Sequence, residues 1–144
     1  MTLPVLLALA LLATPEEWYR KGVSLVENGH PAEAVEPLRA AVEGAPGNAQ
    51  FQKALGVSLA MQRRYSEAAA PFEQACKLAP SLPDACYFHA RNLYALDLYA
   101  PSLTILRRLV ASDPRPWRIW LGIAQAEQAL SHPEVAEQAF RSAI

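Results

Sequence analysis

The chain has 144 residues, which leaves room for one compact domain or one short array of repeats. Its hydrophobic share is 52% and its net charge is -1, which disfavours both a disordered acidic tail and a basic nucleic-acid-binding surface. Twelve prolines at recurring positions, against six glycines, indicate helices that end at regular intervals.

Residues 1–14 differ in composition from the rest of the chain. No side chain is charged before Glu16, and residues 3–13 are almost entirely Leu, Ala and Val. This stretch is too short for a transmembrane helix, which needs about twenty residues. It has the outline of an export signal cleaved between Ala10 and Pro15, although no Lys or Arg precedes it. Export predicts a periplasmic or extracellular protein. The alternative is that this stretch forms a buried N-terminal helix, and the protein is then predicted to be cytoplasmic.

The rest of the chain repeats with a period of 34 residues. Shifting the sequence by this period aligns two columns of small residues: Gly22, Gly56, Ala90 and Ala124, and Ala34, Ala68, Ser102 and Ala136. Pro46, Pro80 and Pro114 close three successive units. The period divides the chain into four repeats, of which the last is incomplete: 15–48, 49–82, 83–116 and 117–144.

Each repeat is predicted to hold two amphipathic helices, because its apolar residues recur at spacings of three and four. Ala34, Leu38 and Ala41 show this spacing in the first repeat. The two small columns allow close approach of helices, and larger residues such as Leu38 and Phe72 fill the space beside them. One helix pair cannot bury its own apolar face, so neighbouring pairs must stack.

The pattern resembles the tetratricopeptide repeat family, whose 34-residue units carry Trp, Leu-Gly, Tyr, Ala, Phe, Ala and Pro at set places. The second repeat matches through Leu55, Gly56, Leu59, Tyr65, Ala68, Phe72, Ala75 and Pro80. The resemblance implies an all-α fold, a right-handed superhelical array of helix-turn-helix repeats (an α-solenoid). The sequence departs from the pattern at Lys21 and His89, at Ser102 in the alanine column and at Glu127 in a leucine column.

The resemblance also implies a concave groove along the first helices of successive repeats. The residues expected to bind a partner there are tyrosines and cations: Tyr19, Lys53, Tyr87, Arg91, Tyr94 and Arg118. Such a lining suits an extended peptide or an amphipathic helix, and Lys53 and Arg118 are expected to attract acidic groups. We therefore expect a non-catalytic scaffold or adaptor for a protein partner. The alternative is a structural spacer, the N-terminal part of a longer repeat array.

No group of residues predicts catalysis, a cofactor or a metal. His30, His89 and His132 lie far apart, and there is no glycine-rich phosphate loop and no basic stripe. His89, Cys76 and Cys86 lack a fourth metal ligand at a suitable spacing. We therefore expect no enzyme activity, no cofactor and no nucleic-acid partner.

Cys76 and Cys86 lie symmetrically about the turn at Ser81, on the second helix of one repeat and the first helix of the next. Facing helices would bring them together in a disulfide, and two buried thiols are the alternative.

The sequence stops inside an amphipathic helix that contains Phe140 and Ile144. An uncovered repeat leaves apolar side chains in water. We therefore expect self-association through the C-terminal helix pair, or further repeats in the natural chain.

Overall fold

The computed structural model describes residues 12–144, which form eight helices and no strand. The predictions for the apolar N-terminal segment, an export signal or a buried helix, therefore concern residues that lie almost wholly outside the described range. The helices are α2 (Pro15–Glu27), α3 (Pro31–Gly44), α4 (Ala49–Met61), α5 (Tyr65–Leu78), α6 (Ala85–Ala95), α7 (Tyr99–Leu109), α8 (Pro116–Ala129) and α9 (Pro133–Ala143).

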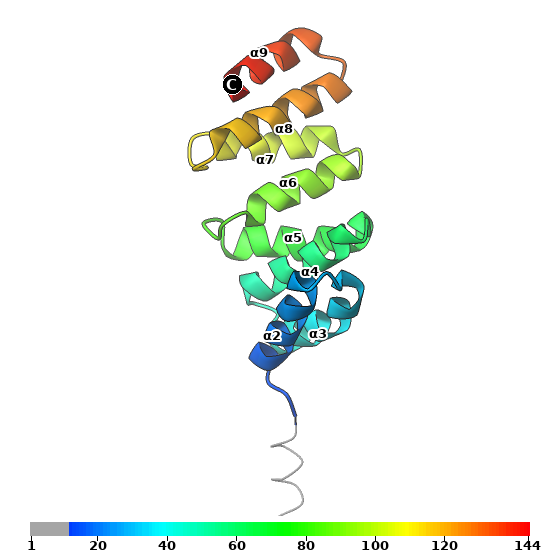
Figure 1. Cartoon of the computed structure of the whole chain (residues 1–144). Coiled ribbons are helices and arrows are strands. Elements are labelled where there is room, and N and C mark those ends of the chain that lie inside the picture. Colours follow the sequence, from blue (N-terminus) through cyan, green and yellow to red (C-terminus); the bar gives the residue numbers. More distant parts are fainter. Residues whose placement is uncertain (1–11) are drawn as a thin grey trace, which may run out of the picture.

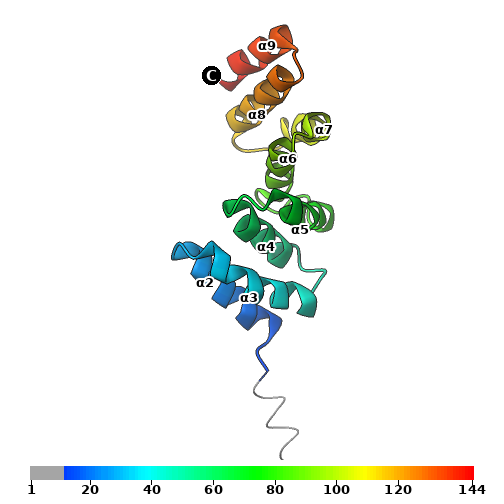
Figure 2. The ribbon, with the colours of Figure 1, turned by 90° about the vertical axis from the view of Figure 1, so that its right-hand side faces the viewer.

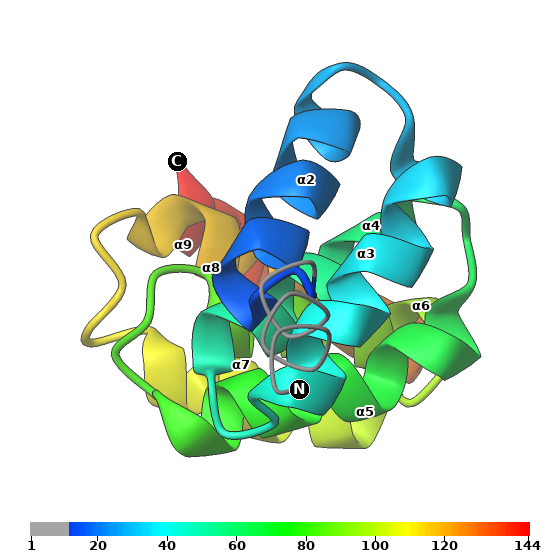
Figure 3. The ribbon, with the colours of Figure 1, turned by 90° about the horizontal axis from the view of Figure 1, so that it is seen from below.

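The helices form pairs that stack in chain order into an elongated array (Figure 1). Each first helix packs on its own second helix, and each second helix packs on the first helix of the next pair. In Figure 2, α4 and α6 lie on one side of the array and α5 and α7 on the other. Figure 3 looks along the array and shows that the pairs turn about its long axis. The predicted all-α solenoid is confirmed.

Local sequence explains where several helices begin. Thr14 caps α2 in a reciprocal arrangement: its hydroxyl accepts from the backbone N–H of Glu17 at 3.2 Å, and the Glu17 carboxylate accepts from the Thr14 N–H at 3.0 Å. Asn48 caps α4 by accepting from the N–H groups of Gln50 and Phe51. These side chains satisfy donors that have no partner within the helix.

The turn inside each pair contains one residue in the left-handed region, and these residues recur at the repeat period. They are Gly29, Arg63, Asp97 and Ser131, with φ angles of 81°, 59°, 61° and 62°. A side chain makes this conformation costly, and glycine adopts it freely. The sequence alone did not reveal this column, because its four members differ in residue type.

Both columns of small residues are buried, as the packing argument requires. A Cβ atom added at Gly22 would lie 2.4 Å from Leu38 Cγ, and one added at Gly56 would lie 2.7 Å from the Phe72 ring. Leu38 and Phe72 are 0% and 2% exposed, so neither has free space to retreat into. The first helix of each of these two pairs therefore touches its second helix through a glycine.

Two of the residues that depart from the family pattern have polar groups, and both find hydrogen-bond partners in the structure. The Ser102 hydroxyl donates to the backbone oxygen of Ala90 at 2.8 Å, across the third helix pair. Glu127, which is 2% exposed, accepts from Arg107 and lies 2.7 Å from His132 Nδ1. A buried carboxylate requires such partners, and here they come from the preceding pair and from the turn before α9.

Replacing Gly56 by Ala is expected to lower the free energy of unfolding by about 1 kcal/mol. Overpacking against Phe72 costs about 1–3 kcal/mol, and the better helix propensity of Ala offsets up to about 1 kcal/mol of this. Gly47→Ala is the matched control, because a Cβ atom there meets nothing within 4 Å. Urea unfolding followed by circular dichroism measures both variants. A Gly56→Ala protein as stable as the parent would contradict the packing argument.

Candidate functional site

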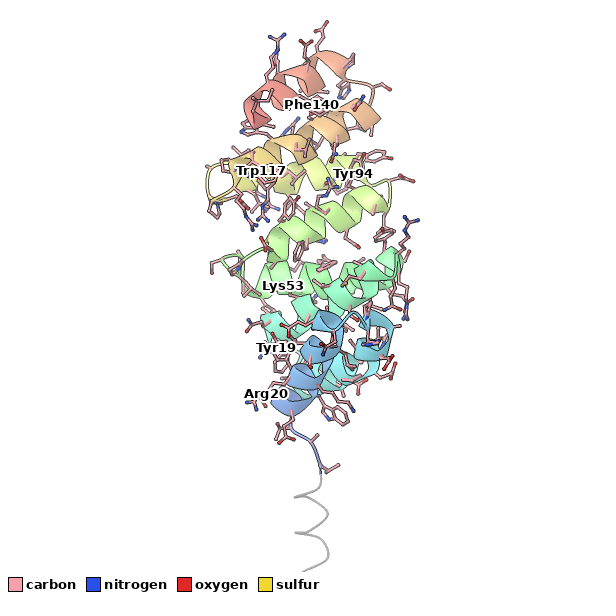
Figure 4. All side chains as sticks on the ribbon, in the orientation of Figure 1. Tyr19, Arg20, Lys53, Tyr94, Trp117 and Phe140 are labelled. Carbon is pink, nitrogen blue, oxygen red and sulfur yellow. A yellow bond between two sulfur atoms is a disulfide. The ribbon has the colours of Figure 1, made fainter. Side chains whose placement is uncertain are left out.

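The first helices of successive pairs lie next to one another and form one side of the array. We call the surface formed by α2, α4, α6 and α8 the first-helix surface, and each of these helices contacts the next one in the series. Tyr19, Lys53 and Tyr94 lie on successive members of the series (Figure 4). The last two helices of the series are also joined directly, because Arg91 Nη1 on α6 donates to Gln125 Oε1 on α8 at 2.7 Å.

The α2–α4 part of this surface combines an aromatic stack with a cation. The rings of Tyr19 and Phe51 are stacked with centroids 4.7 Å apart. Burial raises the pKa of Tyr19, and the charge of Glu27 raises it further, so the phenol stays protonated at neutral pH. Lys53 Nζ donates to the backbone oxygen of Pro83 at 3.1 Å, which ties α4 to the loop before α6. Both predicted side chains are therefore held in place.

The α6–α8 part contains the other two predicted tyrosines, each beside an arginine. The Arg118 guanidinium lies 4.0 Å from the Tyr87 ring centroid, and the Arg91 guanidinium lies 5.2 Å from that of Tyr94. Tyr94 also packs against Tyr99, with ring centroids 5.2 Å apart. Tyr87, Arg91 and Tyr94 are all partly exposed. Their exposed parts are free to make contacts, and their packing within the array holds them in place.

Arg118 is not the accessible cation that the sequence predicted. It is 8% exposed, and its Nη2 atom lies 2.6 Å from Asp84 Oδ1 and 2.6 Å from Asp113 Oδ2. Asp84 is also paired with Arg115 at 2.8 Å. Two carboxylates already balance the Arg118 charge, so the expectation that it attracts acidic groups is corrected. Its role is to join the start of α6 to the loop before α8.

The Asp113 carboxylate titrates below its usual range because of this pairing. Burial by itself would raise the pKa of Asp113, but hydrogen bonds from the Arg118 side chain and the Arg115 backbone N–H outweigh burial and lower it. The same contacts act on the other partner: burial opposes the charge of Arg118, and its bonds to Asp113 and Asp84 raise its pKa overall. Both groups are therefore charged at neutral pH.

Polar ties between repeats form a feature that the sequence analysis missed. Ser58 donates to the backbone oxygen of Pro31 at 2.6 Å, and Asn92 Nδ2 donates to that of Tyr65 at 3.0 Å. Donors and acceptors are both one repeat period apart. The signal available in the sequence is a polar residue recurring on an otherwise apolar helix face at Ser58 and Asn92.

The structure brings Cys76 and Cys86 together in a disulfide between α5 and α6, with their Sγ atoms 1.99 Å apart. The bond forms part of the wall of a cavity of about 570 Å³, which also contains His89, Lys77 and Arg108. Burial lowers the pKa of His89, whose Nδ1 atom has no hydrogen-bond partner among the described residues. The redox state of the two cysteines in the natural protein stays a prediction.

At the C-terminal pair, Val135 and Phe140 are 45% and 36% exposed. Self-association through this pair stays a prediction.

Within residues 12–144, no three His, Cys, Asp or Glu side chains are grouped so as to hold a metal ion. The same range contains no helix of the length and apolarity needed to cross a membrane.

The family model of the tetratricopeptide repeat matches residues 19–83 and 88–144. The chain belongs to the tetratricopeptide repeat family. Tetratricopeptide repeat protein 33 of Mus musculus is 27% identical over 104 residues, which cover 71% of this chain and 39% of that protein. The Homo sapiens protein of the same name is 26% identical over 105 residues, 72% of this chain and 39% of that protein. The chain thus spans about two fifths of the length of these relatives.

Solved structures of other repeat proteins share the fold. The structure titled "MamA MSR-1 C2" superposes with a TM-score of 0.84 at 18% identity, covering 91% of this chain and 75% of that one. "MamA 41-end from Desulfovibrio magneticus RS-1" gives a TM-score of 0.82 at 22% identity, covering 90% and 73%. At these identities the likeness concerns the arrangement of the tetratricopeptide helices.

The Asp113→Asn variant is expected to lose about 1–3 kcal/mol of unfolding free energy at pH 7, because Arg118 loses one of its two carboxylates. The unfolded-state pKa of Asp is about 3.9, and the folded-state pKa is lower, so the stabilisation is present above pH 4 and is lost on acidification. The difference between variant and parent should therefore shrink below about pH 4. Denaturant titrations between pH 3 and pH 7 measure it.

The control for this experiment is Glu137→Gln, which removes the exposed pair with Arg141 on α9. Exposed pairs contribute about 0–1 kcal/mol, so this variant should resemble the parent at every pH. A loss for Asp113→Asn that is equal at pH 3 and pH 7 would refute the assigned ion pair.

Proposed function

We propose that this tetratricopeptide chain is a protein-interaction scaffold that binds an extended or helical segment of its partner along the first-helix surface. The observation that carries the proposal is a set of partly exposed tyrosines and cations on three successive first helices: Tyr19 on α2, Lys53 on α4, and Tyr87, Arg91 and Tyr94 on α6. Aromatic rings beside cations supply apolar contact area together with hydrogen-bond donors. This combination suits a peptide backbone and its side chains.

Fixed side chains support this function on energetic grounds. Binding costs conformational entropy for each side chain that it immobilises, about 0.5–1.5 kcal/mol for a flexible one. Tyr94 is already packed between Arg91 and Tyr99, and Tyr19 is stacked on Phe51. Much of this cost is therefore met when the array folds.

Charge favours one orientation of the bound segment. Glu16 and Glu27 lie on α2, whereas Lys53 and Arg91 lie on α4 and α6. With the Arg118 charge balanced internally, Lys53 and Arg91 supply the positive potential of the central part of the surface. We infer that the acidic end of the segment lies over α4 and α6.

The test inserts a photo-crosslinking residue in place of Tyr87 and, separately, in place of exposed Thr104 on α7. Irradiation in the native host followed by mass spectrometry should yield a partner from position 87 and not from position 104. With the purified partner, Lys53→Glu should lower affinity by about tenfold, mainly through slower association. Arg108→Glu on α7 is the matched control and should change affinity less than twofold.

A spacer module, the alternative function, predicts a different result. Neither position would then yield a specific cross-link, and charge reversal at Lys53 would change no binding. Partner capture from position 104 alone would also contradict binding through the first-helix surface.

We further propose that the protein works outside the cytoplasm after removal of its N-terminal segment. The uncharged apolar stretch before Glu16 supports this, and so does the pairing of Cys76 with Cys86, because disulfides persist in oxidising compartments. Intact-mass spectrometry of unreduced protein from the native host should give a chain that starts between Ala10 and Pro15 and is two hydrogens lighter than the dithiol. Reduction should restore those hydrogens. A chain that retains Met1 and two alkylatable thiols would refute export.

A further inference from the structure

His89 on α6 is a titratable residue at a place where the neighbouring repeats bury an apolar one. Leu55 lies one repeat period before it and Ile123 one period after it, and they are 5% and 3% exposed. The His89 side chain lies in the wall of the cavity of about 570 Å³ between α5, α6 and α7. An aliphatic side chain would serve the packing of this pair, so packing alone does not explain a histidine.

The surroundings of the His89 ring accept its neutral form and oppose its protonated form. The Nδ1 atom is buried and has no hydrogen-bond partner among the described residues. A neutral ring with its proton on Nε2 leaves Nδ1 without a hydrogen, whereas a protonated ring carries an N–H group on both nitrogens. Protonation therefore buries a charged donor that has no acceptor, which costs free energy.

The charged groups that face this ring come from α5 and α7. Helix α5 contributes Glu73 and Lys77, whose side chains pair with each other at 2.8 Å, and α7 contributes Arg108. Burial is the largest cause of the lowered pKa of His89; the charge of Glu73 raises this pKa, and that of Lys77 lowers it. Because Glu73 and Lys77 together carry no net charge, they do little to stabilise a proton on His89.

We propose that His89 is an acid-sensitive switch in the third helix pair: its neutral ring packs between α5 and α7, and uptake of a proton loosens the packing of α6 on α7. The loosening falls on the α7 side because the bond between Cys76 and Cys86 ties α6 to α5, one helical turn before His89. Tyr87 and Arg91 lie on either side of His89 along α6. Acid therefore also displaces this part of the first-helix surface, a consequence that rests on the proposed function.

The pH range of the switch follows from the direction of the pKa change. The unfolded-state pKa of His is about 6.5 and the folded-state pKa of His89 is lower, so the open form binds more protons than the closed form between these two values. The stability of the third pair is therefore complete above about pH 7 and falls as the pH drops below about 6.5. Uptake of one proton raises the equilibrium constant for opening by at most about tenfold per pH unit.

Hydrogen–deuterium exchange followed by mass spectrometry measures this opening. The protein with its disulfide intact is compared at pH 7, 6 and 5, and each rate is corrected for the intrinsic pH dependence of exchange. Protection of α6 and α7 should fall by up to about tenfold per pH unit, whereas α2 and α3 should keep theirs. His89→Leu, which introduces the residue of the second repeat, should abolish the loss. His30→Gln, at an exposed histidine, is the matched control and should retain it.

Charge variants on α5 distinguish the switch from a packing role of the His89 ring. Glu73→Gln leaves Lys77 without its partner and should lower the pKa of His89, measured from the NMR shifts of its ring protons. Lys77→Gln frees the Glu73 carboxylate and should raise this pKa. Shifts of the same sign in the two variants, protection of α6 and α7 that does not change with pH, or a pH dependence that survives in His89→Leu would each overturn the switch.

Partner affinity at pH 7 and pH 5 connects the switch to the proposed function. It should fall at pH 5 for the parent and remain within twofold for His89→Leu. An equal affinity at both pH values, despite the loss of protection, would refute the effect on the first-helix surface. If α6 and α7 loosen but no partner binds along that surface, the proposed function fails and the switch stands. If partner binding follows Lys53 but protection does not change with pH, the switch fails and the proposed function stands.

Discussion

The close approach of the two helices in a pair is the constraint on which the array depends. In the first two pairs a glycine lies directly against a large buried side chain, Gly22 against Leu38 and Gly56 against Phe72. This contact lets the two helices of a pair approach closely, and the side chains at the contact determine how the two helices cross. In the third and fourth pairs Ala90 and Ala124, both fully buried, take the same place, so a small residue recurs in all four pairs that make up the first-helix surface.

Polar contacts then fix one repeat on another. The hydrogen bonds from Ser58 and Asn92 tie a first helix to the start of the preceding second helix. The ion pairs of Arg118 with Asp84 and Asp113 make a comparable tie between the third and fourth pairs. Apolar stacking alone permits sliding between pairs, and directed bonds select one register. These hydrogen bonds and ion pairs therefore also determine where the side chains of the first-helix surface lie.

The sequence predicted the helices and their stacking because both depend on spacing. Small residues at positions such as Gly56 and Ala68 recur at the repeat period, and this periodicity is visible in one dimension. The burial of Arg118 was not predicted, although Asp84 lies one repeat period before it, because the second carboxylate belongs to Asp113 in the loop before α8, and helix periodicity does not define the course of that loop. The acceptor of Asn92 is a backbone oxygen, which every residue possesses, so no residue type marks it.

The disulfide between α5 and α6 affects the elasticity of the array. The buried core falls into two clusters, one around Leu38 and Phe72 and one around Leu106 and Ile119, and Cys86 belongs to the second. The covalent bond therefore crosses from the second pair to the third, next to the boundary between the clusters. In a repeat array each unit contacts only its neighbours, so bending of the whole array is shared among the interfaces between units. When this disulfide is formed, we expect bending to concentrate at the α3–α4 and α7–α8 interfaces, and the central span from Lys53 to Tyr94 to move as one stiff unit.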